Sequence, residues 1–192
     1  MIETTEKKEE ISIMQMKKKL IVVMIVGILF MLSIVAGKKY LDKKSAEKEY
    51  QDGVELIQNY VTDYLVHNYE GIEKIEWQGV GIEWRNSKTK GPSLFGNYVN
   101  CDVRIFASKE NYFTMRYSLH KGTDYDNDLK KYVLLDSMNP SNTDRAVNLG
   151  KENTTDMLNE KDRQIFVKIK KSIKGSPNAK VIYNLDTYEL KY

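Results

Sequence analysis

The sequence is poor in the residues that build metal and catalytic sites. Its single cysteine, Cys101, excludes an internal disulfide, and its two histidines, His67 and His120, stand far apart. Zinc sites need clustered Cys and His ligands at characteristic spacings, and no such cluster occurs. No G-x-S-x-G or comparable motif of nucleophilic catalysis occurs either. The sequence therefore predicts a protein that is not an enzyme, with no cofactor, no metal site and no catalytic residue.

Three aspartates at alternate positions, Asp124, Asp126 and Asp128, resemble the first ligands of a calcium loop. Such a loop also needs glycine at its sixth position and an acidic residue at its twelfth. Leu129 and Leu135 stand at those positions. We therefore interpret the segment as a solvated turn.

Residues 45–192 lack an excess of either charge, with 21 basic and 22 acidic residues. The net charge of +3 comes from the first 44 residues, where 9 lysines stand against 5 acidic residues. Domains that bind nucleic acid carry a basic patch. The balanced charge therefore argues against a nucleic-acid partner.

Residues 20–36 contain no charged side chain. This run of 17 residues is followed by Gly37 and is flanked by lysines 17–19 and 38–39. A charged side chain costs roughly 2.5–3.5 kcal/mol at the centre of a membrane helix. About 17–25 apolar residues cross the hydrocarbon core as a helix. We therefore expect a transmembrane helix over residues 20–37.

A cleaved signal peptide is the competing interpretation of the same run. Its cleavage site should have small residues at the last and third-from-last positions, and here Ala36 fits but Ile34 does not. The run is also longer than the usual ~7–15 residues of a signal-peptide core. These features favour a retained signal anchor. The true start of translation, at Met1, Met14 or Met16, stays open.

The lysines around the run set its orientation. Five precede it and five follow it closely, so the positive-inside rule gives a tie, which the three lysines at 17–19 tip toward an inside N-terminus. A disulfide-free exported domain suits a Gram-positive surface protein. The predicted layout is that of a single-pass cell-membrane protein. It comprises a cytoplasmic tail (1–19), the transmembrane helix (20–37), a juxtamembrane spacer (38–49) and an extracytoplasmic α+β domain (50–192).

The domain is predicted to begin with a helix that ends near Asn68, because apolar residues recur there at helical spacing and Gly71 follows. Short strands come next, and the alternation of apolar residues switches parity across Gly79, which predicts a bulge or tight turn. Strict alternation over residues 98–107 and 112–120 predicts an antiparallel hairpin. Its dry face should bury Cys101, Val103, Ile105, Met115 and Tyr117.

The rest of the domain shows weaker patterns. We expect a short strand at 131–136, a polar segment at 137–153, a helix over 155–174 and closing strands at 181–183 and 188–192. The predicted fold class is α+β, with one antiparallel sheet and two helices packed on one of its faces.

Aromatic and basic residues fall on the other face of this sheet or beside it. Trp77 and Trp84 have opposite parity across Gly79, so at most one of them needs to face the core. An aromatic patch with nearby charge suits a protein partner, whereas a covering helix at 155–174 would turn the same side chains into core. The candidate partner-binding residues are Trp84, Tyr98, Arg104, Phe106, Tyr112 and Arg116.

Part of the sequence resembles a known group of proteins. The matching residues are Tyr64, Leu65, Asn68, Tyr69, Ile72 and Ile75, then Gly91-Pro92, and then Gly96-Asn97-Tyr98-Val99-Asn100 with Asp102. Over residues 55–120 the chain resembles uncharacterised small membrane- or lipid-anchored extracytoplasmic proteins of Firmicutes. This resemblance implies one exported α+β domain and carries over no catalytic residues. The layout is also similar to that of membrane-anchored immunity proteins, which guard streptococci against secreted toxins.

Two functions are compatible with these observations. The first is a membrane-anchored extracytoplasmic module that binds a secreted or envelope protein, in an immunity or envelope-associated role. The alternative is a structural subunit of a membrane machine such as a conjugation apparatus. A subunit of that kind should oligomerise, whereas a binding module should be monomeric with one exposed patch.

Overall fold

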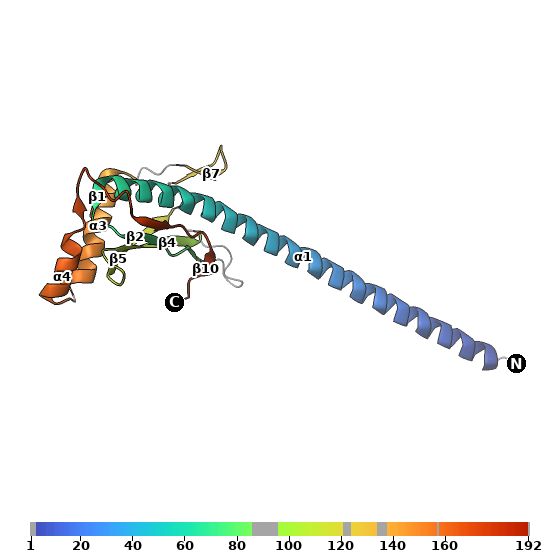
Figure 1. Cartoon of the computed structure of the whole chain (residues 1–192). Coiled ribbons are helices and arrows are strands. Elements are labelled where there is room, and N and C mark those ends of the chain that lie inside the picture. Colours follow the sequence, from blue (N-terminus) through green and yellow to red (C-terminus); the bar gives the residue numbers. More distant parts are fainter. Residues whose placement is uncertain (1–2, 86–95, 121–123, 134–137, 157, 192) are drawn as a thin grey trace. The chain divides into compact units, whose positions relative to one another are not determined.

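The computed structural model describes residues 3–85, 96–120, 124–133, 138–156 and 158–191 (Figure 1). The chain divides into two units, Met1–Ala46 and Glu47–Tyr192. The fold class is α+β, as predicted: a long helix with an apolar N-terminal part precedes a sheet-rich C-terminal region.

The described part of the chain contains long and short elements of both kinds. The helices are α1 (Glu3–Asn68), α3 (Pro140–Thr155) and α4 (Glu160–Val167). The longer strands are β2 (Lys74–Trp77), β3 (Val80–Glu83), β4 (Tyr98–Phe106), β5 (Tyr112–Leu119), β9 (Lys180–Ile182) and β10 (Thr187–Glu189). The two-residue strands are β1 (Tyr69–Glu70), β6 (Tyr125–Asp126), β7 (Lys131–Tyr132) and β8 (Lys170–Lys171).

The helix α1 includes the apolar run. Among the described residues it is the one helix that is long and apolar enough, by length and composition, to cross a membrane. Its most apolar window has a mean hydropathy of 2.9, and none of that window is buried inside the protein. Residues 38–49, which were predicted as a spacer, are helical and belong to α1. The end of α1 at Asn68 agrees with the prediction, and Gly71 follows in the left-handed region with φ +82°.

One mixed sheet forms the centre of the second unit. β4 pairs in the antiparallel direction with β5 along one edge and with β2 and β3 along the other. β9 and β10 then pair with β2 and β3, but in the parallel direction. The prediction of a purely antiparallel sheet was therefore wrong. The closing strands sit where expected in the sequence, but they reach β2 and β3 after a long return of the chain.

A bulge at Gly79 separates β2 from β3. Trp77 lies opposite Val103, and Gly81 lies opposite Asn100. The segment from β2 to β3 therefore contains one residue more than the stretch of β4 that pairs with it. Gly79 adopts φ +96°, in the left-handed region that favours glycine. The predicted bulge is confirmed. Because of the extra residue, the apolar side chains of β2 and β3 point to the same face of the sheet, and both Trp77 and Val80 are buried.

The hairpin of β4 and β5 has the predicted faces. The turn between them closes with a hydrogen bond from the Ala107 amide to the Asn111 carbonyl. All five side chains that were expected to be buried are buried, namely Cys101, Val103, Ile105, Met115 and Tyr117. The dry face of the hairpin therefore forms one side of the hydrophobic core.

The three helices that the structure describes contribute to the core from this same face. From α1, the Thr62 hydroxyl accepts a hydrogen bond of 3.0 Å from the Trp77 indole. Gly150 of α3 lies against Phe113, and the Phe113 ring is 6.3 Å from that of Phe166 in α4. Trp77, Val103 and Met115 are register neighbours, and Phe113 has the same parity, so these contacts lie on one side of the sheet. These helices do not cover the opposite side of the sheet.

The helix predicted over 155–174 is present only in part, as the short helix α4. A second helix that was not predicted, α3, occupies most of the segment predicted to be polar. Asn139 caps α3 by accepting from the Asn142 amide, and Pro140 stands in the first turn, where its missing N–H costs nothing. Residues 170–171 pair with β1 as strand β8, which takes them out of any helix. Ile173, which falls within the predicted helix, is fully exposed.

The short strand that follows the hairpin was also predicted. The strand expected at 131–136 is present as β7, which pairs with β6, while residues 134–136 lie outside the described residues. The side chains of His67 and His120, at the ends of α1 and β5, are both exposed.

Candidate functional site

Five of the six predicted partner-binding residues share the sheet face opposite the helices, which we call the outer face. On β4 and β5 this face consists of the even-numbered positions, because register partners point to the same side. Asp102 lies opposite Arg116, Arg104 opposite Thr114, and Phe106 opposite Tyr112. The five residues that share this face are Tyr98, Arg104, Phe106, Tyr112 and Arg116, with Tyr98 at the far end of β4 from Phe106 and Tyr112.

Trp84 lies apart from this group. It follows the end of β3, and its ring lies 6.2 Å from the ring of Tyr50 on α1. Trp77 is buried in the core below the same helix. Both tryptophans therefore lie on the helix side of the sheet, because the bulge at Gly79 cancels the difference in parity that the sequence shows.

Phe106 belongs to the outer face but is only 6% exposed. The ammonium group of Lys74 lies 3.7 Å from the centre of its ring, and the ring of Tyr112 is 5.0 Å away. Tyr112 remains exposed, and the Arg104 guanidinium lies 4.9 Å from its ring centre. Phe106 therefore supports an aromatic and cationic surface that Tyr112 and Arg104 present to solvent.

Carboxylates hold the cations of the outer face in place. Arg116 donates two hydrogen bonds, of 2.8 and 2.9 Å, to the two carboxylate oxygens of Asp102. Glu76 accepts from Lys74 and lies 3.9 Å from Arg104. The hydrogen bond from Lys74 is the main cause that lowers the pKa of Glu76, with a second contribution from Gln78. The Glu76 carboxyl therefore stays ionised and the arginines stay oriented.

A hollow of about 420 Å³ opens on this face. Tyr188 of β10 reaches it because its register partner, Gly81, has no side chain to fill the space. Sequence analysis missed this contribution, since the parallel pairing of β10 with β3 joins distant parts of the chain. The lining residues are Gln78, Asp102, Arg104, Thr114 and Tyr188.

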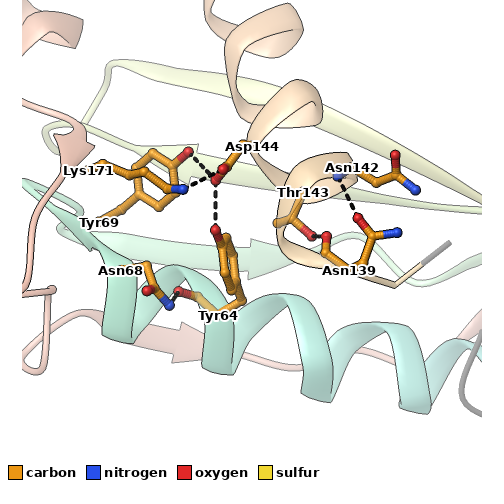
Figure 2. A network of polar contacts seen from close by, with 8 residues as sticks. All are labelled: Tyr64, Asn68, Tyr69, Asn139, Asn142, Thr143, Asp144 and Lys171. Carbon is orange, nitrogen blue, oxygen red and sulfur yellow. Dashed lines mark hydrogen bonds and ion pairs between the residues drawn. The ribbon is translucent and has the colours of Figure 1, made fainter. Parts of the chain in front are cut away.

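A second polar cluster lies at the junction of four elements (Figure 2). One oxygen of the Asp144 carboxylate, on α3, accepts hydrogen bonds of 2.8 Å from the hydroxyls of Tyr64 and Tyr69. Its other oxygen pairs with the ammonium group of Lys171 on β8. This cluster was not predicted, because its centre, Asp144, falls in the segment 137–153, which was predicted only to be polar.

The pKa values in the cluster follow from these contacts. Burial disfavours the charged form of Asp144, but hydrogen bonds from Lys171, Tyr69 and Tyr64 outweigh it and lower the pKa of the carboxyl. Burial, followed by the hydrogen bond to Asp144, raises the pKa of Tyr69 and that of Tyr64. At neutral pH the cluster therefore holds one carboxylate, two neutral phenols and one ammonium group, which is the arrangement that joins its elements most strongly.

The described residues offer little for catalysis. They contain no group of three or more His, Cys, Asp or Glu side chains that could hold a metal ion. Cys101 is fully buried, and burial raises the pKa of its thiol, so it has the properties of a core residue rather than a nucleophile. What the outer face can do chemically is to make contacts through arginine and tyrosine.

Comparison of the chain with protein-family models, with curated proteins and with solved structures finds no match.

Proposed function

We propose that the protein is a single-pass membrane protein whose extracytoplasmic domain binds a secreted or envelope protein through the outer face. The observation that carries this proposal is the position of the helices. They all pack on one side of the sheet, while on the other side Arg104 and Tyr188 line a hollow and Tyr112 and Arg116 lie on the same face. Arginine and tyrosine are enriched among the residues that dominate binding energy at protein interfaces.

The apolar run of α1 supports the membrane part of the proposal. The side chains of Leu20, Phe30 and Val35 are each more than half exposed. A run of this kind is unfavourable in water and suits the hydrocarbon core of a bilayer. The lysines at 17–19 favour an N-terminal tail in the cytoplasm and residues 50–192 outside.

The concrete role that we infer is an immunity or envelope-associated one. It draws on the resemblance of residues 55–120 to anchored extracytoplasmic proteins of Firmicutes and on the similar layout of membrane-anchored immunity proteins. A partner with exposed carboxylates suits the outer face best, since Arg104 and Arg116 both reach its surface with side-chain exposures of 40% and 61%.

The test uses the full chain in an uncharged detergent and capture of proteins from the secreted and envelope fractions of the producing cell. Arg104→Ala and Tyr112→Ser should each abolish capture of a specific partner and leave the melting temperature unchanged. Arg145→Ala, on the outside of α3, and Tyr183→Ser, beyond the end of β9, are the matched controls and should keep the partner.

Two outcomes would count against the proposal. A large fall in melting temperature for both outer-face variants would mean that these side chains stabilise the fold instead of contacting a partner. Stable self-association that needs residues 1–19 would favour the alternative of a subunit in a membrane machine.

A further inference from the structure

A pocket of about 260 Å³ lies beside the Asp144 cluster, away from the outer face. The strand β8 forms one wall, α3 forms another, and the ring of Tyr69 lies between them. The lining residues are Tyr69, Asp144, Asn148, Lys151, Ile169, Lys170 and Lys171. The volume is below the roughly 300–1,000 Å³ of sites for drug-sized ligands, so any occupant is small.

Three lysines line the pocket, and two of them have acidic partners. Lys170 lies 3.2 Å from Glu70, and Lys171 pairs with Asp144. The third, Lys151, donates a hydrogen bond of 2.8 Å to the backbone carbonyl of Ile169. In the part of the chain that the structure describes, no carboxylate forms an ion pair with Lys151. The pocket therefore holds one ammonium group whose charge is not balanced.

The donor capacity of Lys151 is only partly used. An ammonium group carries three donors, and one of them is directed to Ile169. The side chain is partly buried, and burial lowers the pKa of Lys151 from its ordinary value. A partly buried cation without a counter-ion is unfavourable, and an anion in the pocket would remove that cost. The exposed amide of Asn148, one turn before Lys151 on α3, lines the same pocket and adds a neutral donor.

We propose that this pocket binds a small oxyanion, a ligand with one carboxylate or phosphate group, through the Lys151 ammonium and the Asn148 amide. Asp144 also lines the pocket, but its charge is offset by Lys171 and by two phenol hydrogen bonds. The net charge that the ligand meets is therefore positive. This site is independent of the proposed partner-binding face.

The experiment measures thermal unfolding of the full chain in an uncharged detergent. Sodium phosphate and sodium acetate are titrated separately against sodium chloride at matched ionic strength. A ligand that binds the native state raises the melting temperature in a saturable way. We expect such a rise with at least one of the two anions, and the anion that saturates at the lower concentration identifies the ligand class.

Variants assign the effect to the pocket. Lys151→Met should weaken the binding of the anion at least tenfold, while Lys151→Arg, which keeps the charge, should retain it. Asn148→Ala should also weaken binding, and because that side chain is exposed this variant should fold normally. Lys109→Met, at an exposed lysine in the turn before β5, is the matched control and should bind like the unchanged protein.

A second measurement covers the case in which Lys151→Met does not fold. Lysines labelled with ¹³C at Cε report their own pKa by NMR without a change to the ammonium group, and the Lys151 signal is the one missing in Lys151→Arg. The oxyanion should raise the pKa of Lys151 and leave that of Lys109 unchanged. No saturable effect of either anion, or an equal effect in Lys151→Met and Lys109→Met, would overturn the proposal.

Discussion

The carboxylate of Asp144 joins parts of the chain that are far apart in sequence. It accepts hydrogen bonds from Tyr64 near the end of α1 and from Tyr69 in β1, and it pairs with Lys171 in β8. A partly buried carboxylate is stable only when its oxygens are satisfied, and here three donors converge on it. This one side chain therefore couples the position of α3 to that of its neighbours.

The first prediction concerns the pH dependence of this cluster. Because the folded-state pKa of Asp144 is lowered, its contribution to stability is present at neutral pH and is lost as the pH falls through that folded value, from about pH 5 downward. Asp144→Asn should lower the unfolding free energy at pH 7 and flatten its decline in acid. Denaturant unfolding at a series of pH values measures both effects.

Asp63→Asn provides the control for that measurement. Asp63 is an exposed carboxylate on α1 whose partner is His67, so its removal should leave the acid profile nearly unchanged. Equal profiles for Asp144→Asn and the unchanged protein would show that the cluster does not contribute to stability.

The burial of single residues could be predicted only where strand alternation decides it. Val103 and Ile105 were predicted to be buried and are. Asn100 lies on the predicted face of its strand but is also buried, against Gly81. Phe106 is covered by Lys74, a residue of another strand. The last two outcomes depend on the register with β2 and β3, which a single sequence does not specify.

At the scale of elements, the bulge at Gly79 sets the register of two strands at once. Because of the bulge, the pairing of β3 with β4 is offset by one residue from the pairing of β2 with β4. Just after the bulge, the Val80 amide donates a hydrogen bond to the carbonyl of Asp186, which precedes β10. A side chain at position 79 would place its Cβ 2.6 Å from the Asp186 carbonyl oxygen. Glycine is therefore required there both by its φ and by the close approach of another backbone segment.

The second prediction follows from this geometry. Gly79→Ala should lower the unfolding free energy by more than the roughly 1–3 kcal/mol typical of a left-handed non-glycine residue. Gly96→Ala is the matched control, because Gly96 also has a positive φ but has open space around it. Denaturant unfolding of both variants isolates the effect of the contact with Asp186, and equal losses would argue against it.

The helix α3 was not predicted, and two of its residues show why. Pro140 and Gly150 are both residues that usually interrupt helices. In the structure Pro140 stands in the first turn, and Gly150 provides space for Phe113 and the Thr114 carbonyl. The reason for this glycine is a packing contact with β5, so it is visible only once the sheet is assembled.

At the scale of the whole molecule, the places of several elements in the sequence could be predicted, but the direction of the closing strands could not. The helix, the hairpin and the two closing strands stand close to their expected places in the sequence. The parallel pairing of β9 with β2 requires the chain to return across the sheet after α3 and α4. Nothing in the composition of residues 180–189 distinguishes a parallel partner from an antiparallel one.

The third prediction tests the proposed topology. Protease added to intact protoplasts should remove residues 45–192 and leave a small fragment held in the membrane. The physical basis is the uncharged run of α1 with three lysines directly before it. A cytoplasmic marker protein should stay intact in the same sample. A domain that survives until the membrane is opened would mean the opposite orientation.

The position of β9 and β10 has a consequence for how the protein is made. These strands are synthesised long after β2 and β3, yet they pair directly with them. Until β9 and β10 have been synthesised, the edges of β2 and β3 that they cover have no partner, so the complete sheet cannot form on a shorter nascent chain. A premature stop codon that removes these strands would leave an open edge for other chains to pair with.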